Sequence, residues 1–330
     1  MENIKKNPLS LQLNADDFLP ASNEEKQSLV IMRESVNFWK DGLRRLKKNK
    51  IAMVSFVFII AIAIFAYLLP AVWPYSYAEQ VKGSNNLAPF EYSASEQARI
   101  DAGEKVFPHI LGTDRMGRDF AVRIMMGTRV SLSVGLIASV LVLIIGATYG
   151  AVAAFAGGWV DNIMMRIIDV LDSIPMTLYV ILIMVVVGPG ISSIIIALGL
   201  TFWVKMARIV RGQVLTLKQQ EFVKAAIVTG ADTKRIIVKH LIPNMMGPIM
   251  VNMAMQIPSA IFNEAFLSFV GLGISAPMAS WGTLCNDALA GIYVYPYQMV
   301  YPAIAISVTI LTFNLLSDGL RDAFDPKQRK

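Results

Sequence analysis

The sequence predicts an all-α, polytopic membrane protein with six transmembrane helices. Of its 330 residues, 55% are hydrophobic and 16% are charged, whereas a soluble domain of this size carries about 25% charged residues. The mean hydropathy is +0.53. The hydrophobic residues gather in long runs instead of alternating with polar ones, which is typical of segments that cross a bilayer.

The composition also argues against several kinds of chemistry. The one cysteine, Cys285, excludes an internal disulfide and a multi-cysteine zinc site. His109 and His240 lie far apart in the sequence, which gives little support for a metal site or for histidine-based catalysis. The net charge of +6 need not indicate nucleic acid, because surplus Lys and Arg in a membrane protein usually mark cytoplasmic loops. We therefore expect no catalytic residues, no metal ligands and no nucleic-acid partner.

Residues 1–50 are expected to form a cytoplasmic tail that contains an amphipathic helix. Residues 1–21 are predicted to be disordered, and Ser22 with Glu25 fits a helix-capping box. The apolar face at spacings of three and four consists of Leu29, Met32, Val36, Trp39, Leu43 and Leu46. Two placements fit this helix equally well: flat on the inner membrane surface, or packed on a partner subunit.

Six apolar stretches follow, and each is near the roughly 20 residues that cross about 30 Å of hydrocarbon. The first span ends at Pro70 and precedes an extracytoplasmic loop, 71–129; the other five lie in a domain over 130–318, and 319–330 form a tail. The expected spans are 51–70, 130–155, 170–187, 191–206, 243–262 and 299–316.

The charges of the loops predict the orientation. Basic residues directly before Ile51 place the N-terminus in the cytoplasm, and an even number of spans then places the C-terminus there too. Residues 205–240 fall inside and are rich in Lys and Arg, whereas 263–297 fall outside and contain neither. The interrupted segment 265–292 is expected to lie partly re-entrant on the outer face. Together with the loop Leu111–Asp119 it is a candidate dock for another protein, and Trp281 is either an anchor for that protein or an ordinary interfacial tryptophan.

The polar segment 219–243 between the fourth and fifth spans is the leading candidate site. Gly230 permits a turn, Asp232 can cap a second helix that runs to His240, and Pro243 closes the segment. The residues at helical spacing on one apolar face are Phe222, Ala225, Ala226 and Thr229. This face either docks into a groove on another protein or lies flat on the bilayer, and the residues alone leave both open.

Other residues have two readings each. Gly146 and Gly150 in the second span favour close helix packing over substrate contact. Asp169 and Asp172 follow Arg166, and a pair between Arg166 and Asp169 on one helix face is expected.

Glu264, next to Asn263 at the outer end of the fifth span, has two readings of its own. It either lines the external mouth or makes a structural bond near the turn at 271–273. No Gly-Lys dipeptide occurs in the sequence, so the chain has no Walker-type phosphate loop.

The segment resembles the "EAA loop" of bacterial ABC-importer permeases, which reads Glu-Ala-Ala, three residues, Gly, nine residues, Ile-x-Leu-Pro. This chain has Lys224-Ala225-Ala226, Gly230 and His240-Leu241-Ile242-Pro243 at that spacing, with Lys224 in place of the motif's glutamate. Three further stretches are similar to the second (C-type) permease subunit of dipeptide and oligopeptide importers. They are His109–Asp119, Asn263–Gly273 with Ser280–Thr283, and Asn314–Pro326.

The resemblance implies a type I ABC-importer transmembrane domain in the bacterial inner membrane. Its implied partners are a second homologous permease subunit, two ATP-binding subunits that hold ATP and magnesium, and an extracytoplasmic substrate-binding lipoprotein. The implied ATPase-coupling residues are Glu221, Phe222, Lys224, Ala225, Ala226, Gly230, Ala231, Asp232 and Pro243. Nickel chelates or another small solute are alternative cargoes. A secondary transporter is a weaker alternative, because no inverted repeat or mid-membrane ionisable residue is evident.

Overall fold

The computed structural model describes residues 38–324 of the chain. The chain divides into a first unit that ends at Asp41 and a second unit that begins at Gly42. The expected disordered tail, the Ser22–Glu25 capping box and half of the apolar face of the amphipathic helix lie outside the described residues. Helix α2, Phe38–Lys48, is the described part of that helix, and its basic residues gather in the last turn, where they complement the helix dipole.

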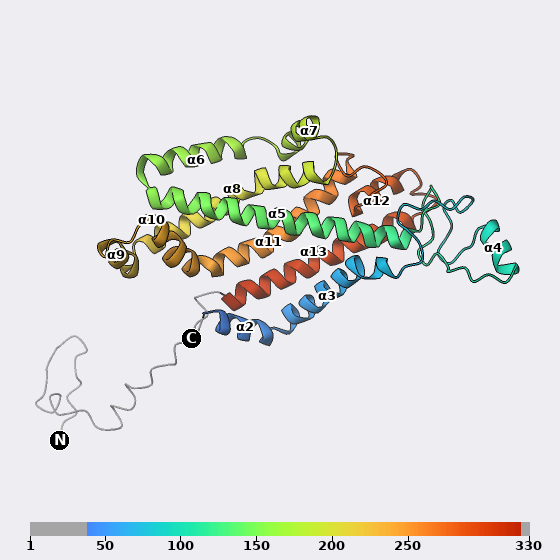
Figure 1. Cartoon of the computed structure of the whole chain (residues 1–330), viewed down its shortest axis with the longest axis horizontal. Helices are drawn as coiled ribbons and strands as arrows, with labels where there is room; N and C mark the ends of the chain where they lie inside the picture. Colours follow the sequence, from blue (N-terminus) through green and yellow to red (C-terminus); the bar gives the residue numbers. More distant parts are fainter. Residues whose placement is uncertain (1–37, 325–330) are drawn as a thin grey trace, which may run out of the picture. The chain divides into compact units, whose positions relative to one another are not determined.

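All regular elements of the described chain are helices, as Figure 1 shows, so the all-α prediction is confirmed. Five helices are long and apolar enough to cross a membrane. They are α3 (Lys50–Tyr67, extended by the short helix η2, Leu69–Ala71), α5 (Phe120–Ala156), α8 (Ile191–Lys218), α11 (Ile242–Phe269) and α13 (Tyr297–Phe324). A sixth span is present if the pair α6 (Gly158–Asp172) and α7 (Met176–Val187) counts as one.

The pair α6 and α7 is bent by 84°. The bend falls at Pro175, which occupies the N-cap of α7, while α6 ends at Asp172 with Ser173 as its C-cap. Proline has no backbone N–H to donate, and it disfavours helical geometry in the residue before it. The expected span 170–187 is therefore not one continuous helix: Val170 to Asp172 belong to α6, and α7 is a separate helix.

Helices α5, α8, α11 and α13 extend beyond the apolar stretches that the sequence marked, and α11 continues to Phe269. Helix α5 begins at Phe120 instead of Val130 because Asp119 caps it, with its Oδ1 accepting the N–H of Val122 at 2.9 Å. Helix α8 continues to Lys218, and α13 continues to Phe324. Hydropathy detects the part of a helix that suits hydrocarbon, whereas capping and tertiary packing decide where the helix ends.

Helices α5 and α8 pack closely through small residues. A Cβ on Gly146 would lie 2.7 Å from both the Cβ of Met206 and the backbone oxygen of Trp203. A Cβ on Gly150 would collide with the backbone oxygen of Ala207. Both glycines are needed because the two backbones approach to a distance that leaves no room for a side chain. The structure thus identifies α8 as the neighbour of the Gly146–Gly150 pair, which has the expected packing role.

Two short helices lie in connecting segments near the start of α5. Helix α4 (Ala94–Asp101) precedes α5 in the chain, and α12 (Trp281–Leu289) lies between α11 and α13. We call this end of the long helices the α12 end, and the opposite end, where α8 leads into the next short helix, the α9 end (Figure 1). Trp281 is fully buried, and its Nε1 donates to Thr128 Oγ1 at 3.1 Å. The expectation that Trp281 anchors a docking protein is therefore wrong, since the indole holds α12 against α5.

Candidate functional site

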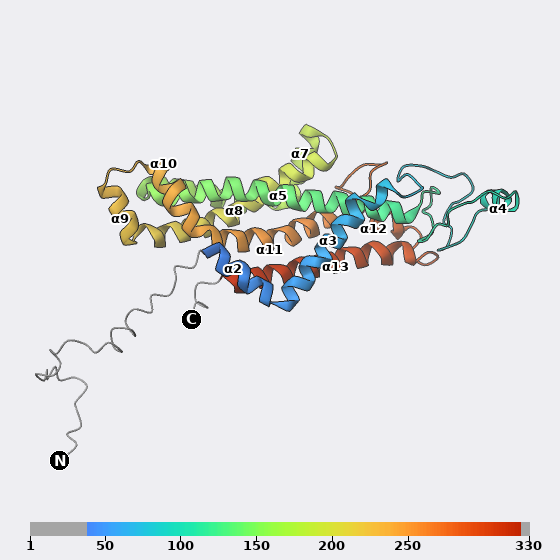
Figure 2. The same ribbon diagram turned by 60° about the horizontal axis from the view of Figure 1, so that its bottom comes forward.

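The predicted segment 219–243 folds as a helix, a turn and a second helical stretch at the α9 end. Helix α9 spans Glu221–Val228, and α10 spans Thr233–Arg235. The π-helical turn η3, Ile236–Leu241, then runs directly into α11. Figure 2 shows α9 and α10 at the same end of the long helices. The expected helix–turn–helix is thus present, with no free loop between its second half and the span α11.

Gly230 ends α9 in a Schellman motif. Its φ is +80°, in the left-handed region that glycine adopts without strain. The N–H of Gly230 donates to Ile227 O, and the N–H of Ala231 donates to Ala226 O, both at 3.0 Å. These two bonds satisfy carbonyls that the helix end would otherwise leave free. The spacing Ala-Ala, three residues, Gly in the sequence is therefore the spacing that this cap requires.

One face of the segment is anchored on the long helices. Val223, Ile236 and Leu241 are buried and belong to one apolar cluster. The same cluster contains Val210 and Val214 of α8 and Met245 of α11, and half-buried Ala226 and Ala231 pack against it. Burial of each aliphatic side chain contributes about 1.5–3 kcal/mol. The segment is therefore held by α8 on one side and by α11 on the other.

The opposite face is open and hollowed. A cavity of about 430 Å³ lies between α9 and the second helical stretch. The lining residues are Phe222, Ala225, Ala226, Thr229, Gly230, Ala231, Arg235 and His240. All four residues that the sequence placed on one apolar face line this cavity, and the sequence did not identify Arg235 and His240 on its other wall. The arrangement is an open notch with a largely apolar wall from α9 and with Arg235 and His240 on the opposite wall.

The remaining predicted residues lie around the notch. Glu221, Lys224 and Asp232 are exposed, and so is Pro243 in the first turn of α11. Asp232 takes the N-cap position of α10, but its side chain makes no capping hydrogen bond; its backbone oxygen accepts the N–H of Ile236 at 3.0 Å instead. The prediction of a side-chain cap is therefore wrong, although the position is right.

Sequence reasoning did not single out Ile227 and Val228, two apolar residues next to the notch. Ile227 is 48% exposed and Val228 is 86% exposed. Such exposure of aliphatic side chains on a short, otherwise polar segment is typical of a contact surface. A signal was available, because both residues are apolar in a segment expected to face the cytoplasm.

Three basic side chains hold the half of α8 that precedes α9. Arg211 makes a two-pronged ion pair with Asp161 of α6, at 2.6 and 2.7 Å. Arg208 contacts Asp172 at 2.7 Å and Asp169 at 3.1 Å. Lys218 donates to the backbone oxygen of Phe155 at 2.6 Å, at the end of α5.

The expected pair between Arg166 and Asp169 is present but longer, at 3.8 Å. Asp169 thus has its closer partner on α8, a partner that helical spacing within α6 could not reveal.

Glu264 is fully buried between α5 and α11. Its carboxylate accepts hydrogen bonds from Ser131 Oγ at 2.6 Å and from Ser268 Oγ at 2.7 Å. The sequence left open whether Glu264 lines the external mouth or makes a structural bond. The structure contains the structural bond, which Glu264 makes to Ser268 and not to the turn at 271–273. Asn263 is half-buried and donates to its own helix at Ser259 O.

At the α12 end, a buried imidazole holds the segment that leads into α5. His109 lies between two carboxylates, with Nδ1 at 2.8 Å from Asp119 and Nε2 at 3.0 Å from Glu96. Burial disfavours the charged ring, but the hydrogen bonds to Asp119 and Glu96 outweigh it and raise the pKa of His109. Tyr75 stacks on the ring at 4.4 Å between centroids, and Trp73 Nε1 donates to Asp119 at 3.2 Å.

Comparison with known proteins gives the fold and the family. Residues 144–330 match the family described as "Binding-protein-dependent transport system inner membrane component", and residues 37–89 match the "N-terminal TM domain of oligopeptide transport permease C". Inward-facing MetNI, a methionine ABC transporter, has a similar structure. The TM-score is 0.51 at 17% identity, over 60% of this chain and 94% of that chain. This likeness confirms the expected importer transmembrane fold.

Two curated relatives cover nearly the whole chain. The oligopeptide transport system permease protein OppC of Bacillus subtilis (strain 168) is 43% identical over 330 residues, which is 100% of each chain. The dipeptide transport system permease protein DppC of the same strain is 46% identical over 311 residues, 93% of this chain and 92% of that one. This chain therefore belongs to the family of multi-pass inner-membrane components of binding-protein-dependent transport systems.

Proposed function

We propose that the chain is a pore-forming permease subunit of a bacterial ATP-driven importer of dipeptides or oligopeptides. Its similarity to oligopeptide and dipeptide permeases over nearly the full length supports this cargo. The proposed coupling to an ATPase rests on one observation: the anchored segment at the α9 end presents an open notch of about 430 Å³. A permease that is driven by a separate ATPase needs such a contact surface.

The proposed assembly places the α9 end and both termini in the cytoplasm and the α12 end outside. Basic residues in the last turn of α2, and again at the end of α8, support this orientation. A second homologous permease completes the path, two ATP-binding subunits dock at the α9 ends, and an extracytoplasmic lipoprotein delivers the peptide. ATP and magnesium belong to the ATP-binding subunits, since this sequence has no Gly-Lys dipeptide for a phosphate loop.

Docking at the notch gives the ATPase a hold on two spans at once. The segment joins α8 at its first end and continues into α11 at its second. When ATP draws the two ATPases together, each pulls its notch inward, and α8 and α11 tilt with it. The energy enters as a difference in contact between the two states of the assembly, as any coupling requires.

A charge placed in the notch tests this role. Ala225 is exposed and lines the notch, so Ala225→Asp is expected to leave the fold intact and to abolish co-purification of the ATP-binding subunits. Val238→Asp is the matched control, because Val238 is exposed on η3 and does not line the notch. Wild-type recovery of the ATPases with Ala225→Asp would refute the coupling role.

A further inference from the structure

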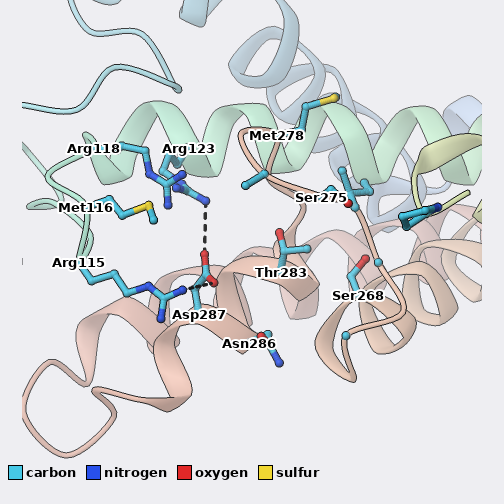
Figure 3. Close-up of a pocket in the computed structure, with 15 residues that line it drawn as sticks. Arg115, Met116, Arg118, Arg123, Ser268, Ser275, Met278, Thr283, Asn286 and Asp287 are labelled. Carbon is cyan, nitrogen blue, oxygen red and sulfur yellow. Dashed lines mark hydrogen bonds and ion pairs between the residues drawn. The ribbon is translucent and has the colours of Figure 1, made fainter.

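A second cavity lies at the α12 end, and its polar walls come from segments far apart in the sequence. Its volume is about 270 Å³. Arg115 and Arg118 enter it from the segment before α5, Arg123 from α5 itself, and Asp287 from α12. Figure 3 shows the three guanidinium groups and the Asp287 carboxylate turned toward one another across the hollow. We call these four residues with Asp114 the arginine cluster.

One carboxylate of the cluster is fully engaged. Asp114 Oδ2 accepts Arg118 Nε and Arg123 Nη1, both at 2.7 Å. Asp114 Oδ1 accepts the backbone N–H groups of Met116 and Arg118 at 2.8 and 3.0 Å. Asp114 therefore fixes the guanidinium groups of Arg118 and Arg123 in place. Both of its oxygens already accept two hydrogen bonds, so it can accept no more from either arginine.

The other carboxylate is only loosely held. Asp287 lies 3.5 Å from Arg115 and 3.5 Å from Arg123, whereas charge-assisted pairs are normally about 2.7–2.9 Å apart. Burial raises the pKa of the Asp287 carboxyl above its usual range in spite of Arg115 and Arg118 nearby. Asp287 thus leaves much of the hydrogen-bonding capacity of the guanidinium groups unused.

Donors remain without acceptors in the described part of the chain. Arg123 is 2% exposed, and its Nε is buried with no hydrogen-bond partner among the described residues. Arg118 is also buried, and within the described chain its guanidinium uses only Nε. A buried donor without a partner costs free energy. Three arginines against Asp114 and Asp287 also leave one positive charge, which one further carboxylate would neutralise.

We propose that this cavity receives one acidic side chain of the extracytoplasmic binding protein when that protein docks on the importer. The inference rests on the proposed function, which places the α12 end outside. The size of the cavity supports a single side chain, because pockets that hold whole small ligands measure about 300–1,000 Å³. Arg118 and Arg123 form the rigid floor, and Arg115, with 56% of its side chain exposed, stands at the mouth.

The test measures how tightly the peptide-loaded binding protein of the same system binds the complete importer in lipid nanodiscs. Arg115→Glu is expected to lower the affinity roughly tenfold, and the wild-type on-rate is expected to fall with added salt. Arg99→Glu is the matched control: Arg99 has 58% of its side chain exposed on α4, pairs with Glu104 and lies outside the cavity. It should leave the affinity unchanged.

Asp287→Asn separates this role from a purely structural one. Removal of the loosely held carboxylate leaves a stronger positive field, so the affinity is expected to rise by about threefold. Unchanged affinity with Arg115→Glu, or a lower affinity with Asp287→Asn, would overturn the proposal. So would saturable binding of a labelled dipeptide, without the binding protein, that Arg115→Glu abolishes, since the cavity would then hold the peptide carboxylate.

These outcomes remain distinct from failure of the proposed function. Co-purification of the ATP-binding subunits with every variant shows that the importer is assembled and that the α9 end works. If assembly is intact and Arg115→Glu binds as the wild type does, only the cavity proposal is lost. If the wild-type chain recruits no ATPase, the proposed function itself is lost.

Discussion

Arg211 of α8 and Asp161 of α6 form a two-pronged ion pair in which Nε and Nη2 of the arginine each meet one carboxylate oxygen. Asp161 is 7% exposed, so its charge depends on this partner. The pair ties α6 to the half of α8 that leads into the notch. In the proposed assembly, a pull on the notch would therefore reach α6 as well as α8 and α11.

Removal of one member of this pair is expected to destabilise the α9 end. Asp161→Asn leaves Arg211 without its counter-charge and is expected to cost about 1.5–3 kcal/mol. Asp169→Asn is the control, because Asp169 is about half exposed and Arg208 keeps Asp172; it should cost below about 1 kcal/mol. Thermal unfolding of the purified complex measures both, and restored stability in Asp161→Arg with Arg211→Asp would identify the pair as the cause.

The α5–α8 contact predicts a sharp difference between two glycines. Gly150→Ala places a Cβ against the backbone oxygen of Ala207, whereas a Cβ on Gly212, in α8, meets nothing within 4 Å. Overpacking costs about 1–3 kcal/mol, so Gly150→Ala should lower the melting temperature of the complex. Gly212→Ala should leave it unchanged or raise it slightly. Equal effects of the two changes would contradict the packing role of Gly150.

The turn at Gly230 predicts that substitutions of this residue weaken the fold and ATPase binding to different degrees. With φ at +80°, a β-branched residue is strained there, and Asn is better tolerated than other non-glycine residues. Gly230→Val is expected to cost about 1–2 kcal/mol and to weaken ATPase binding, with Gly230→Asn intermediate. Affinity of the purified ATPases for the permease measures the series; the reverse order of Asn and Val would show that the cap does not govern the notch.

His109 predicts a dependence on pH at the α12 end. The pKa of its ring is raised above the ordinary 6.5, so the charged ring stabilises the fold fully below that value. The contribution is lost as the pH rises through the higher folded pKa. The pKa of Glu96 is lowered by hydrogen bonds from Ser93 and His109 that outweigh its burial, so its contribution is lost as the pH falls. Maximal protection is therefore expected in mildly acidic solution.

Amide hydrogen exchange of residues 93–119 measures this protection. His109→Gln should exchange faster than wild type in mildly acidic solution and should lose the difference between mildly acidic and alkaline solution. His240→Gln is the control, since His240 lines the notch at the other end. Persistence of the pH dependence in His109→Gln would show that another group is responsible.

The notch shows how far sequence reasoning reached. The order of Ala225, Ala226, Gly230 and Pro243 predicted a capped helix, a turn and a second helix, because local spacing determines each of these features. The side-chain cap by Asp232 was wrong, since the sequence cannot tell whether a residue at an N-cap turns its side chain to the helix or to solvent. The residues left open whether the apolar face docks on another protein or lies flat on the bilayer, and docking stays a proposal.

Contacts between distant segments could not be predicted. Asp169 was expected to pair within its own helix, but Arg208 lies closer because α6 folds back along α8. Glu264 had two readings that only its neighbours Ser131 and Ser268 could decide. The arginine cluster joins segments from before α5, from α5 and from α12, and no periodicity in the sequence connects them. The break at Pro175 was visible as a proline, but hydropathy alone gave one continuous span.

Because η3 runs into α11 without a loop, a rotation of the notch in the proposed assembly would turn α11 directly. The 28 residues of α11 make a rod about 42 Å long. If the ATPase rotates the base of this rod by about 5°, its far tip sweeps about 4 Å sideways. In the proposed assembly Glu264 and Ser268 travel with that tip, so a modest turn at the α9 end becomes a displacement about as wide as a side chain at the α12 end.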